Sequence, residues 1–418
     1  MGQTIIEKIL AKAAGRTQVQ KGEIVFCSPH RILSHDNSAA ISKIFKQINA
    51  PRVWDPERIF IALDHAVPPP DERKALNHKI IREFVQENKI KHFYDCGTGI
   101  CHQVLPENGH VLPGTIIFGS DSHTTTHGAF GAAGIPIGRT ETASVWAIGK
   151  TWLKVPETLK FVLAGKLKKG VYAKDVILFL IGQIGASGAN YKSVEFSGDT
   201  VSRMSISERM TMCNLSAEMG AKAGIVAYDE TTRDWLDSRI HEDYEPLSAD
   251  ADAEYEKIFD YNLEELSPQV ACPHKVDNVV SVKDLPHTKI DVAFLGTCTN
   301  GRLDDLKIAA EIMAGKSLAP GVRLLVYPAS KKVLQDALRL GYIENLVAAE
   351  AQLAVPSCGP CLGAYGGILA PGENCISTAN RNFKGRMGCK EDTGIYLASP
   401  ATVAYSALAG YITTGRQR

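Results

Sequence analysis

The chain has 418 residues, which at about 150 residues per domain suggests two or three domains. Apolar residues make up 44% and charged residues 22%, as in a water-soluble globular protein that buries large cores. Lysine plus arginine and aspartate plus glutamate number 46 each, so there is no net charge to attract a polyanion, which argues against a dedicated nucleic-acid binder.

The cysteine content and the N-terminus argue against a secreted or membrane protein. Ten cysteines are too few for a disulfide scaffold in a chain of this length. Residues 1–16 have the pattern of an amphipathic helix and lack the long apolar core of a signal peptide. No run of 18 apolar residues is present, so no membrane-spanning segment is expected. We therefore expect a cytoplasmic protein with reduced thiols and no membrane partner.

Apolar runs of strand length alternate along the chain with amphipathic, helical patterns. The predicted strands are residues 58–63, 115–118, 290–295 and 322–326. The predicted helices include residues 72–89 and 331–340, where apolar residues recur at helical spacing. Strands alternating with helices predict an α/β fold with parallel sheets covered on both faces.

Polar residues follow directly where these predicted strands end. Asp64 and His65 follow the first strand, residues 119–123 (GSDSH) follow the second, and Cys298 follows the third. In open α/β sheets ligands bind in the crevice at the carboxyl ends of the strands. The sequence therefore predicts a site at these strand ends.

The pattern changes between about residues 156 and 286, which suggests a middle domain. We predict a first domain over residues 1–155, a middle domain over 156–285 and a third over 286–418. Residues 229–265 carry 14 acidic and three basic residues. We expect this segment to be a solvated helix-and-loop surface, with docking of a basic partner as the alternative.

Three cysteines lie in contexts that suggest chemistry: Cys298 in GTCTNGR, and Cys358 and Cys361 in PSCGPC. A Cys-x-x-Cys pair on a tight turn can place two sulfurs on one metal centre, and a third thiolate can complete the site. The spacing alone leaves four interpretations open. They are an iron–sulfur site, a thioredoxin-like dithiol, a zinc site and plain buried thiols.

Histidines and carboxylates at polar turns are candidates for acid–base chemistry. His35, His65, His102 and His123 lie in such turns, and Asp64 and Asp121 are close enough in sequence to fix imidazole tautomers. Each histidine taken alone is more often structural. Glu218 lies in a helix-like stretch of small residues, where a solvated acid is the simpler interpretation.

Residues 380–386 (NRNFKGR) place Arg381 and Arg386 around a glycine, shortly after an apolar run. Arginine side chains bind carboxylates with two parallel hydrogen bonds. The alternative for each arginine is surface charge. The glycine and asparagine content argues against a helix surface, so this segment is a candidate anion-binding loop.

Several motifs occur in order along the whole chain. They are GICHQVLPENG, GSDSHTTTHGAFG, GKTWLKVPETLK, GVYAKDVIL, GTCTNGR, CGPCLG, NRNFKGRMG and YLASPATVAYSALAG. Together they resemble the aconitase superfamily, and within it most closely the large subunits of the isopropylmalate dehydratase and homoaconitase branch. The resemblance implies three α/β domains around a central cluster site, without the fourth, swivelling domain of full-length aconitases.

The resemblance also implies a [4Fe–4S] cluster held only by Cys298, Cys358 and Cys361, with one iron lacking a protein ligand. It implies that Asp64 and His65 protonate the departing hydroxyl, supported by the His102–Asp121 and His123–Glu218 pairs. The residues that it implies for polar contacts with cluster, substrate or substrate carboxylates are His35, Ser122, Asn214, Asn300, Asn380, Arg381 and Arg386. Thr297 replaces the serine usual in the GSCTN motif and keeps the hydroxyl group.

The chain ends at Arg418 without the segment that carries the catalytic base in full-length aconitases. We therefore expect a separate small subunit to supply that base. The resemblance implies a hydro-lyase in leucine biosynthesis that isomerises 3-isopropylmalate. Alternatives are homoaconitase, 2,3-dimethylmalate dehydratase and maleate or citraconate hydratase. A more remote alternative is an aconitase-like protein that binds RNA.

Overall fold

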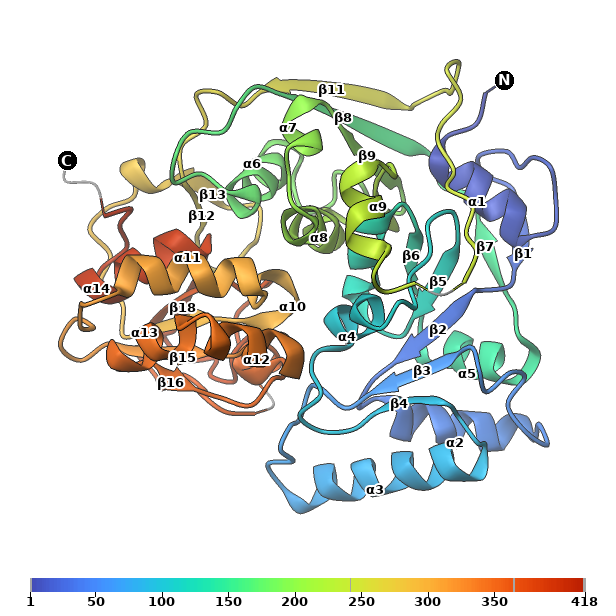
Figure 1. Cartoon of the computed structure of the whole chain (residues 1–418), viewed down its shortest axis with the longest axis horizontal. Coiled ribbons are helices and arrows are strands. Elements are labelled where there is room, and N and C mark those ends of the chain that lie inside the picture. Colours follow the sequence, from blue (N-terminus) through green and yellow to red (C-terminus); the bar gives the residue numbers. More distant parts are fainter. Residues whose placement is uncertain (1, 241, 364, 416–418) are drawn as a thin grey trace.

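The computed structural model describes residues 2–240, 242–363 and 365–415. Three sheets with parallel cores organise this part of the chain, and a two-stranded ribbon accompanies them. In the view of Figure 1 the first sheet lies at the lower right, the middle sheet at the top and the third at the left. The predicted α/β fold with parallel-sheet cores is confirmed. The expectation of a small subunit refers to the end of the chain, and residues 416–418 there lie outside the described residues.

Five parallel strands form the first sheet, in the order β4-β3-β2-β5-β6. The strands are β2 (Arg31–Ser34), β3 (Ile59–Ala62), β4 (His92–Tyr94), β5 (Ile116–Gly119) and β6 (Ala133–Pro136). The helices around it are α2 (Ser38–Ile48), α3 (Glu72–Glu87), α4 (Cys101–Glu107), the 3₁₀ helix η1 (Ser122–Phe130) and α5 (Arg139–Ile148). Every residue of β3 and β5 is buried, as expected for strands covered on both faces.

Local sequence signals set where the helices begin. The carboxylate of Asp71 accepts a 2.8 Å hydrogen bond from the backbone N–H of Lys74 and so caps α3. Ser330 caps α12 (Lys331–Arg339) in the same way, by accepting from the N–H of Val333. Such caps satisfy backbone donors that have no partner inside the helix.

The middle sheet has four parallel strands in the order β10-β9-β8-β11. The strands are β8 (Thr158–Ala164), β9 (Ser193–Ser197), β10 (Ala223–Val226) and β11 (Lys257–Asn262). Its helices are α6 (Ala173–Ile184), α7 (Asp199–Ser202), α8 (Ile206–Leu215), the 3₁₀ helix η2 (Ser216–Met219) and α9 (Glu230–Leu236). The sequence analysis missed β11, because this strand carries none of the continuous apolar pattern of a central strand and is half exposed at the sheet edge.

The third sheet has seven strands in the order β13-β12-β18-β17-β14-β15-β16. They are β12 (Gln269–Ala271), β13 (Val279–Ser281), β14 (Val292–Leu295), β15 (Arg323–Val326), β16 (Gln352–Leu353), β17 (Asn374–Ser377) and β18 (Gly394–Ala398). The helical elements are η3 (Val282–Asp284), α10 (Thr297–Asn300), α11 (Leu303–Met313), α12, α13 (Tyr342–Ala348), η4 (Gly359–Leu362) and α14 (Pro400–Ala409). The five strands β14 to β18 are mutually parallel, and β12 and β13 add antiparallel strands at one edge.

The predicted strands 58–63, 115–118, 290–295 and 322–326 are confirmed as β3, β5, β14 and β15, and the predicted helices 72–89 and 331–340 as α3 and α12. The domain boundaries at residues 155 and 285 stay predictions. Strands β12 and β13 precede residue 285, yet they pair with β18 and each other in the third sheet. The predicted boundary at residue 285 thus follows two strands that pair within the third sheet.

The acid-rich segment 229–265 makes ion pairs with basic residues near the N-terminus. Asp250 pairs with Lys8 at 2.5 Å and Glu245 with Lys12 at 2.9 Å. Lys8 and Lys12 lie on α1 (Ile5–Ala13), the helix predicted at the N-terminus. Part of the acidic surface thus binds this chain's own cations.

An antiparallel ribbon of β1 (Ile24–Cys27) and β7 (Thr151–Lys154) lies beside the first sheet. Its buried face packs Val25, Cys27 and Leu153 into the core that includes Trp146. Its other face leaves Ile24, Phe26 and Trp152 more than half exposed. Within the described residues, no helix has both the length and the hydrophobicity needed to cross a lipid bilayer.

Candidate active site

A cavity of about 270 Å³ lies where loops from the carboxyl ends of the first and third sheets meet. Loops after β2, β3, β5 and β6 of the first sheet contribute to its lining, together with loops after β14, β16 and β17 of the third. The lining comprises His35, Asn37, His65, His102, Ser120, Asp121, Ser122, His123, Arg139, Thr297, Cys298, Cys358, Cys361, Leu362, Asn380, Arg381 and Arg386. This is the position predicted from the polar residues at the strand ends.

The carboxylate of Asp121 lies among four imidazoles. Nε2 of His102 donates to Asp121 Oδ1 at 2.8 Å, and the backbone N–H of His123 donates to the same oxygen at 2.8 Å. Nε2 of His65 lies 3.8 Å and Nε2 of His35 3.9 Å from Asp121 Oδ2. Burial raises the pKa of Asp121, but these hydrogen bonds lower it by more, so the net pKa lies well below its usual value. Asp121 is therefore a fixed negative charge in the cavity wall.

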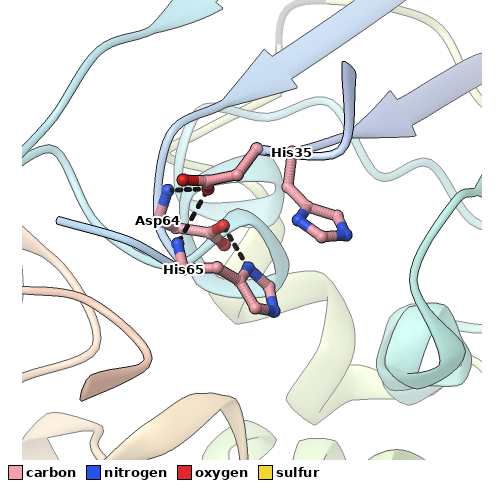
Figure 2. Close-up of side chains that lie close together, drawn as sticks. His35, Asp64 and His65 are labelled. Atoms are coloured by element: carbon pink, nitrogen blue, oxygen red, sulfur yellow. Dashed lines mark hydrogen bonds and ion pairs between the residues drawn. The ribbon is translucent and has the colours of Figure 1, made fainter. Parts of the chain in front are cut away.

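His65 is oriented by its neighbour Asp64, as Figure 2 shows. Nδ1 of His65 donates to Asp64 Oδ1 at 2.6 Å, and the other carboxylate oxygen of Asp64 accepts from the backbone N–H of Cys101 at 2.7 Å. Asp64 is fully buried, so its carboxylate has no contact with solvent and stays paired with His65. This pairing directs Nε2 of His65 toward the cavity and toward Asp121. The His35 ring stacks on the His65 ring at 4.1 Å between centroids.

Glu218 links His123 to Arg381 behind the cavity wall. Glu218 Oε1 accepts from His123 Nε2 at 2.8 Å and from Arg381 Nε at 2.8 Å. Burial raises the pKa of Glu218, but His123 and Arg381 lower it by more, so the net pKa lies below its usual value. Glu218 comes from η2 of the middle sheet's region, so all three sheets contribute to the site.

The three candidate thiols all lie in the cavity wall, and each is 6% exposed. Cys298 is in α10, directly after β14, and its neighbour Thr297 adopts a left-handed backbone with φ of 75°. Such a conformation is strained for a residue other than glycine and is often found at functional sites. The backbone N–H of Cys358 donates to the backbone oxygen of Asp64 at 2.9 Å. That bond ties the cysteine loop to the loop that carries His65.

The side chains around these sulfurs suit a metal cluster. Asn214 Nδ2 donates to Cys298 Sγ at 3.2 Å, Asn380 Nδ2 donates to the same sulfur at 3.6 Å, and an Arg386 amino group lies 3.7 Å from Cys361 Sγ. Hydrogen-bond donors aimed at cysteine sulfurs are typical of iron–sulfur sites, because they stabilise thiolate charge. Burial raises the pKa of the Cys298 thiol to about 12, so metal binding would have to supply the driving force for deprotonation.

The residues present therefore fit the [4Fe–4S] cluster that the resemblance implies. Among the described residues no other cysteine lines the cavity, and all ten cysteines are free thiols. A dithiol mechanism of the thioredoxin type would leave Cys298 and its two amide donors without a role.

Most of the residues singled out from the sequence lie at this cavity. Twelve line it: His35, His65, His102, Asp121, Ser122, His123, Cys298, Cys358, Cys361, Asn380, Arg381 and Arg386. Asp64, Asn214 and Glu218 lie behind the wall and bond to lining residues.

Asn300 is the exception, because its amide group donates to Asp305 Oδ1 at 2.9 Å and to Thr211 at 3.3 Å. It is absent from the cavity lining. The α10 helix turns successive side chains in different directions, so Asn300 cannot face the cavity beside Cys298. We therefore assign Asn300 a contact with α11 and α8 rather than with a ligand.

Sequence reasoning missed several lining residues, of which Arg139 is the most consequential. Arg139 begins α5 just after β6, so the strand-end rule that selected Asp121 could have found it.

Asp36 was also missed. Its carboxylate accepts from the backbone N–H groups of Asp64 and His65, at 2.9 and 2.8 Å, and so fixes the loop that carries His65. Asp36 directly follows the candidate residue His35, and this adjacency is the feature of the sequence that could have identified it.

Comparison with known proteins identifies relatives over the full chain. Residues 7–410 match the aconitase family (aconitate hydratase). A probable 3-isopropylmalate dehydratase large subunit from Methanothermobacter thermautotrophicus is 49% identical and is covered over 99% of both chains. A probable methanogen homoaconitase large subunit from Methanosarcina mazei is 51% identical, over 92% of this chain and 98% of the relative. Aconitase X from Thermococcus kodakaraensis, a solved structure, aligns with a TM-score of 0.48 at 14% identity, over 85% of this chain and 84% of that one.

Replacing one cavity thiol tests the cluster assignment. Cys361→Ser should lose the visible absorbance of an iron–sulfur cluster after anaerobic reconstitution with iron and sulfide, because serine is a poor ligand for this site. Cys375→Ser is the matched control, since Cys375 is a buried thiol that does not line the cavity. Equal iron and sulfide content in the two variants would remove Cys361 from the ligand set.

Proposed function

The chain belongs to the aconitase family, and from this premise we propose that it is the large subunit of a hydro-lyase that dehydrates and rehydrates a 2-hydroxy diacid. The substrate that we propose is 3-isopropylmalate, isomerised to 2-isopropylmalate in leucine biosynthesis. One observation carries the proposal: three thiols, the Asp64–His65 pair and two arginines converge on one cavity. Full-length similarity to large subunits named for isopropylmalate dehydratase supports it.

Homoaconitase is the second candidate, and one feature of the cavity favours it. Arg139 adds a third guanidinium to those of Arg381 and Arg386. A tricarboxylate such as homocitrate offers one more carboxylate than isopropylmalate and could use that cation. Leu362 in the same wall would instead contact the alkyl group of isopropylmalate. The similarity to a homoaconitase large subunit supports this candidate as well.

We propose that Cys298, Cys358 and Cys361 hold the cluster alone, so that one iron lacks a protein ligand. When bound, such a cluster supplies a Lewis acid for the hydroxyl and an adjacent carboxylate of the substrate. The amide groups of Asn214 and Asn380 would hold Cys298 in place.

Arg381 and Arg386 are proposed to bind the substrate's carboxylates. Glu218 holds Arg381 through Nε, which fixes the direction of the guanidinium and leaves the two terminal nitrogens for a ligand. Nε of Arg386 is buried without a partner among the described residues, so it is a donor awaiting an acceptor. Two guanidiniums in one wall match the two carboxylates of a diacid.

His65 is proposed to be the general acid. Its Nδ1–H is committed to the buried Asp64, so Nε2, which faces the cavity, is the nitrogen that can give a proton to the departing hydroxyl. Asp121 lies 3.8 Å from Nε2 and stabilises the imidazolium before transfer. On rehydration the same nitrogen would take the proton back from water.

The proton alpha to the carboxylate requires a base, which we propose comes from a separate small subunit. The relatives' names as large subunits support a two-chain enzyme. The exposed apolar face of the β1–β7 ribbon is a candidate surface for that partner, because Trp152 shares a second cavity with Ser120, Asp121 and Ser122 of the catalytic wall. A protein seated there would border the site that it completes. Ten free thiols are compatible with the reducing cytoplasm that we propose as the setting.

Loss of the general acid should separate catalysis from cluster binding. His65→Ala should lower kcat by about 10²–10⁴-fold while iron and sulfide content stay at the wild-type level. His92→Ala, a half-buried histidine on β4 outside the cavity, is the control and should keep full activity. Unchanged turnover in His65→Ala would assign the acid to another residue.

The partner and the substrate can be tested together. The reconstituted chain alone should show no turnover, and the chain with its small subunit should be active in an anaerobic assay. Isopropylmalate, homocitrate, 2,3-dimethylmalate, maleate and citraconate should be compared by kcat/KM, with isopropylmalate preferred. Full activity of the chain alone would contradict the two-subunit proposal, and preference for homocitrate would select the second candidate.

The ribbon surface generates a separate expectation. The double variant Phe26→Glu, Trp152→Glu should abolish co-purification with the small subunit. The cluster content should stay unchanged, because both side chains lie on the exposed outer face of the β1–β7 ribbon. Leu338→Glu, an exposed apolar position on α12, is the control. Undiminished co-purification of the double variant would move the partner to another face.

A further inference from the structure

A second cluster of reactive side chains lies behind the catalytic loop, outside the cavity lining. Cys96, at the carboxyl end of β4, has its sulfur 3.4 Å from Nδ1 of His78 on α3. Nε2 of His78 donates to Asp36 Oδ1 at 2.8 Å. Thiol, imidazole and carboxylate thus stand in a line, the arrangement that activates cysteine nucleophiles. The proposed catalytic mechanism uses none of the three in chemistry.

The charges around Cys96 are set mainly by α3. An amino group of Arg82 lies 3.8 Å from Cys96 Sγ, so two basic side chains face the sulfur. Asp95 offsets part of this charge, since both its oxygens accept from Arg82 at 2.7 and 2.8 Å. Asp36 lies on the far side of the imidazole. Cys96 itself is partly exposed, whereas His78 is only 1% exposed.

His78 is placed to take the thiol proton. Burial lowers the pKa of His78, but its hydrogen bonds with Asp36 and Cys96 raise it by more, to about 9. The imidazole is therefore protonated at neutral pH, and its two N–H groups donate to Asp36 and to the sulfur. A cation beside a cysteine favours the thiolate, which is the nucleophilic form.

We propose that Cys96 is a nucleophilic thiol that forms mixed disulfides with small disulfides, and that this modification is transmitted through His78 and Asp36 to the catalytic loop. The thiolate attacks one sulfur of the disulfide, a new S–S bond forms, and the old S–S bond breaks. The departing thiolate takes a proton from water. Cys96 is oxidised and the small disulfide is reduced to one thiol, so electrons balance.

The path to the catalytic loop consists of hydrogen bonds to Asp36. Its carboxylate accepts from the backbone N–H groups of Asp64, His65 and Ala66, at 2.9, 2.8 and 3.1 Å. A disulfide at Cys96 removes the sulfur that accepts from Nδ1 of His78 and adds bulk beside the ring. The ring is then displaced, its bond to Asp36 Oδ1 is disturbed, and Asp36 shifts against the three amides.

Alkylation measures the first part of the proposal. At pH 7, iodoacetamide should modify Cys96 about tenfold faster than Cys389, because an imidazole and a guanidinium face the Cys96 sulfur. Cys389 and Cys272 are the matched controls, since both are partly exposed and free. Peptide mass spectrometry on the full-length chain reads each site separately. Alkylation rates at Cys96 equal to those of the two controls would overturn the proposal.

The His78→Gln variant tests the role of the imidazole. The glutamine Nε2 can still donate to Asp36 but places no cation beside the sulfur, so the Cys96 alkylation rate should fall to the control rate. An unchanged rate would contradict the assignment. Should this variant fail to fold, the wild-type pH profile of Cys96 against Cys389 decides the same question.

Hydrogen exchange tests transmission without relying on enzyme activity. After anaerobic treatment with oxidised glutathione, amide exchange in the peptide containing residues 64–66 should rise, and dithiothreitol should reverse the change. Cys96→Ser should show no change on treatment. A mixed disulfide at Cys96 with unaltered exchange at residues 64–66 would rule out transmission. Neither readout depends on the substrate, so failure here is distinct from failure of the proposed hydro-lyase function.

Discussion

Parallel strands end at the same edge of a sheet, and this constraint brings the candidate site together. In the first sheet, β2, β3 and β5 end one or two residues before His35, Asp64 and Asp121. In the third sheet, β14 and β17 end just before Cys298 and Asn380. The two edges face a common cavity, so side chains far apart in the sequence act in one small volume. A hydrogen bond from Cys358 to the backbone of Asp64 couples the two edges.

Charge pairing is what makes this buried arrangement stable. Asp64 and Glu218 are buried and the side chain of Asp121 is 15% exposed, and each accepts a hydrogen bond from an imidazole. An unpaired buried carboxylate would be strongly unfavourable. The same pairs fix which imidazole nitrogen faces the cavity. The contacts that stabilise the site therefore also determine its acid–base chemistry.

The sequence predicted the parts of this structure that depend on local pattern. Continuous apolar runs located β3, β5, β14 and β15, and the strand-end rule located Asp64, Asp121 and Cys298. Strand β11 was missed because a half-exposed edge strand lacks a continuous apolar run. The assignment of β12 and β13 to the third sheet depends on long-range pairing with β18, which composition cannot reveal.

Side-chain direction and non-local partners are the parts of the site that sequence patterns do not show. Asn300 lies two residues from Cys298 but turns to Asp305. Asp36 acts through backbone groups of a loop 28 residues away, at Asp64, and has no motif of its own. Arg139 follows β6, so the strand-end rule covered it, but β6 was not among the predicted strands. Sequence distance thus says little about which side chains meet at a cavity.

The central claim is that three thiols alone hold a cluster with one iron open to substrate. Mössbauer spectroscopy of anaerobically reconstituted, ⁵⁷Fe-labelled protein tests it most directly. One iron should differ from the other three, and its signal should change when substrate is added. Four equivalent irons that do not respond to substrate, or a preparation without inorganic sulfide, would contradict the account.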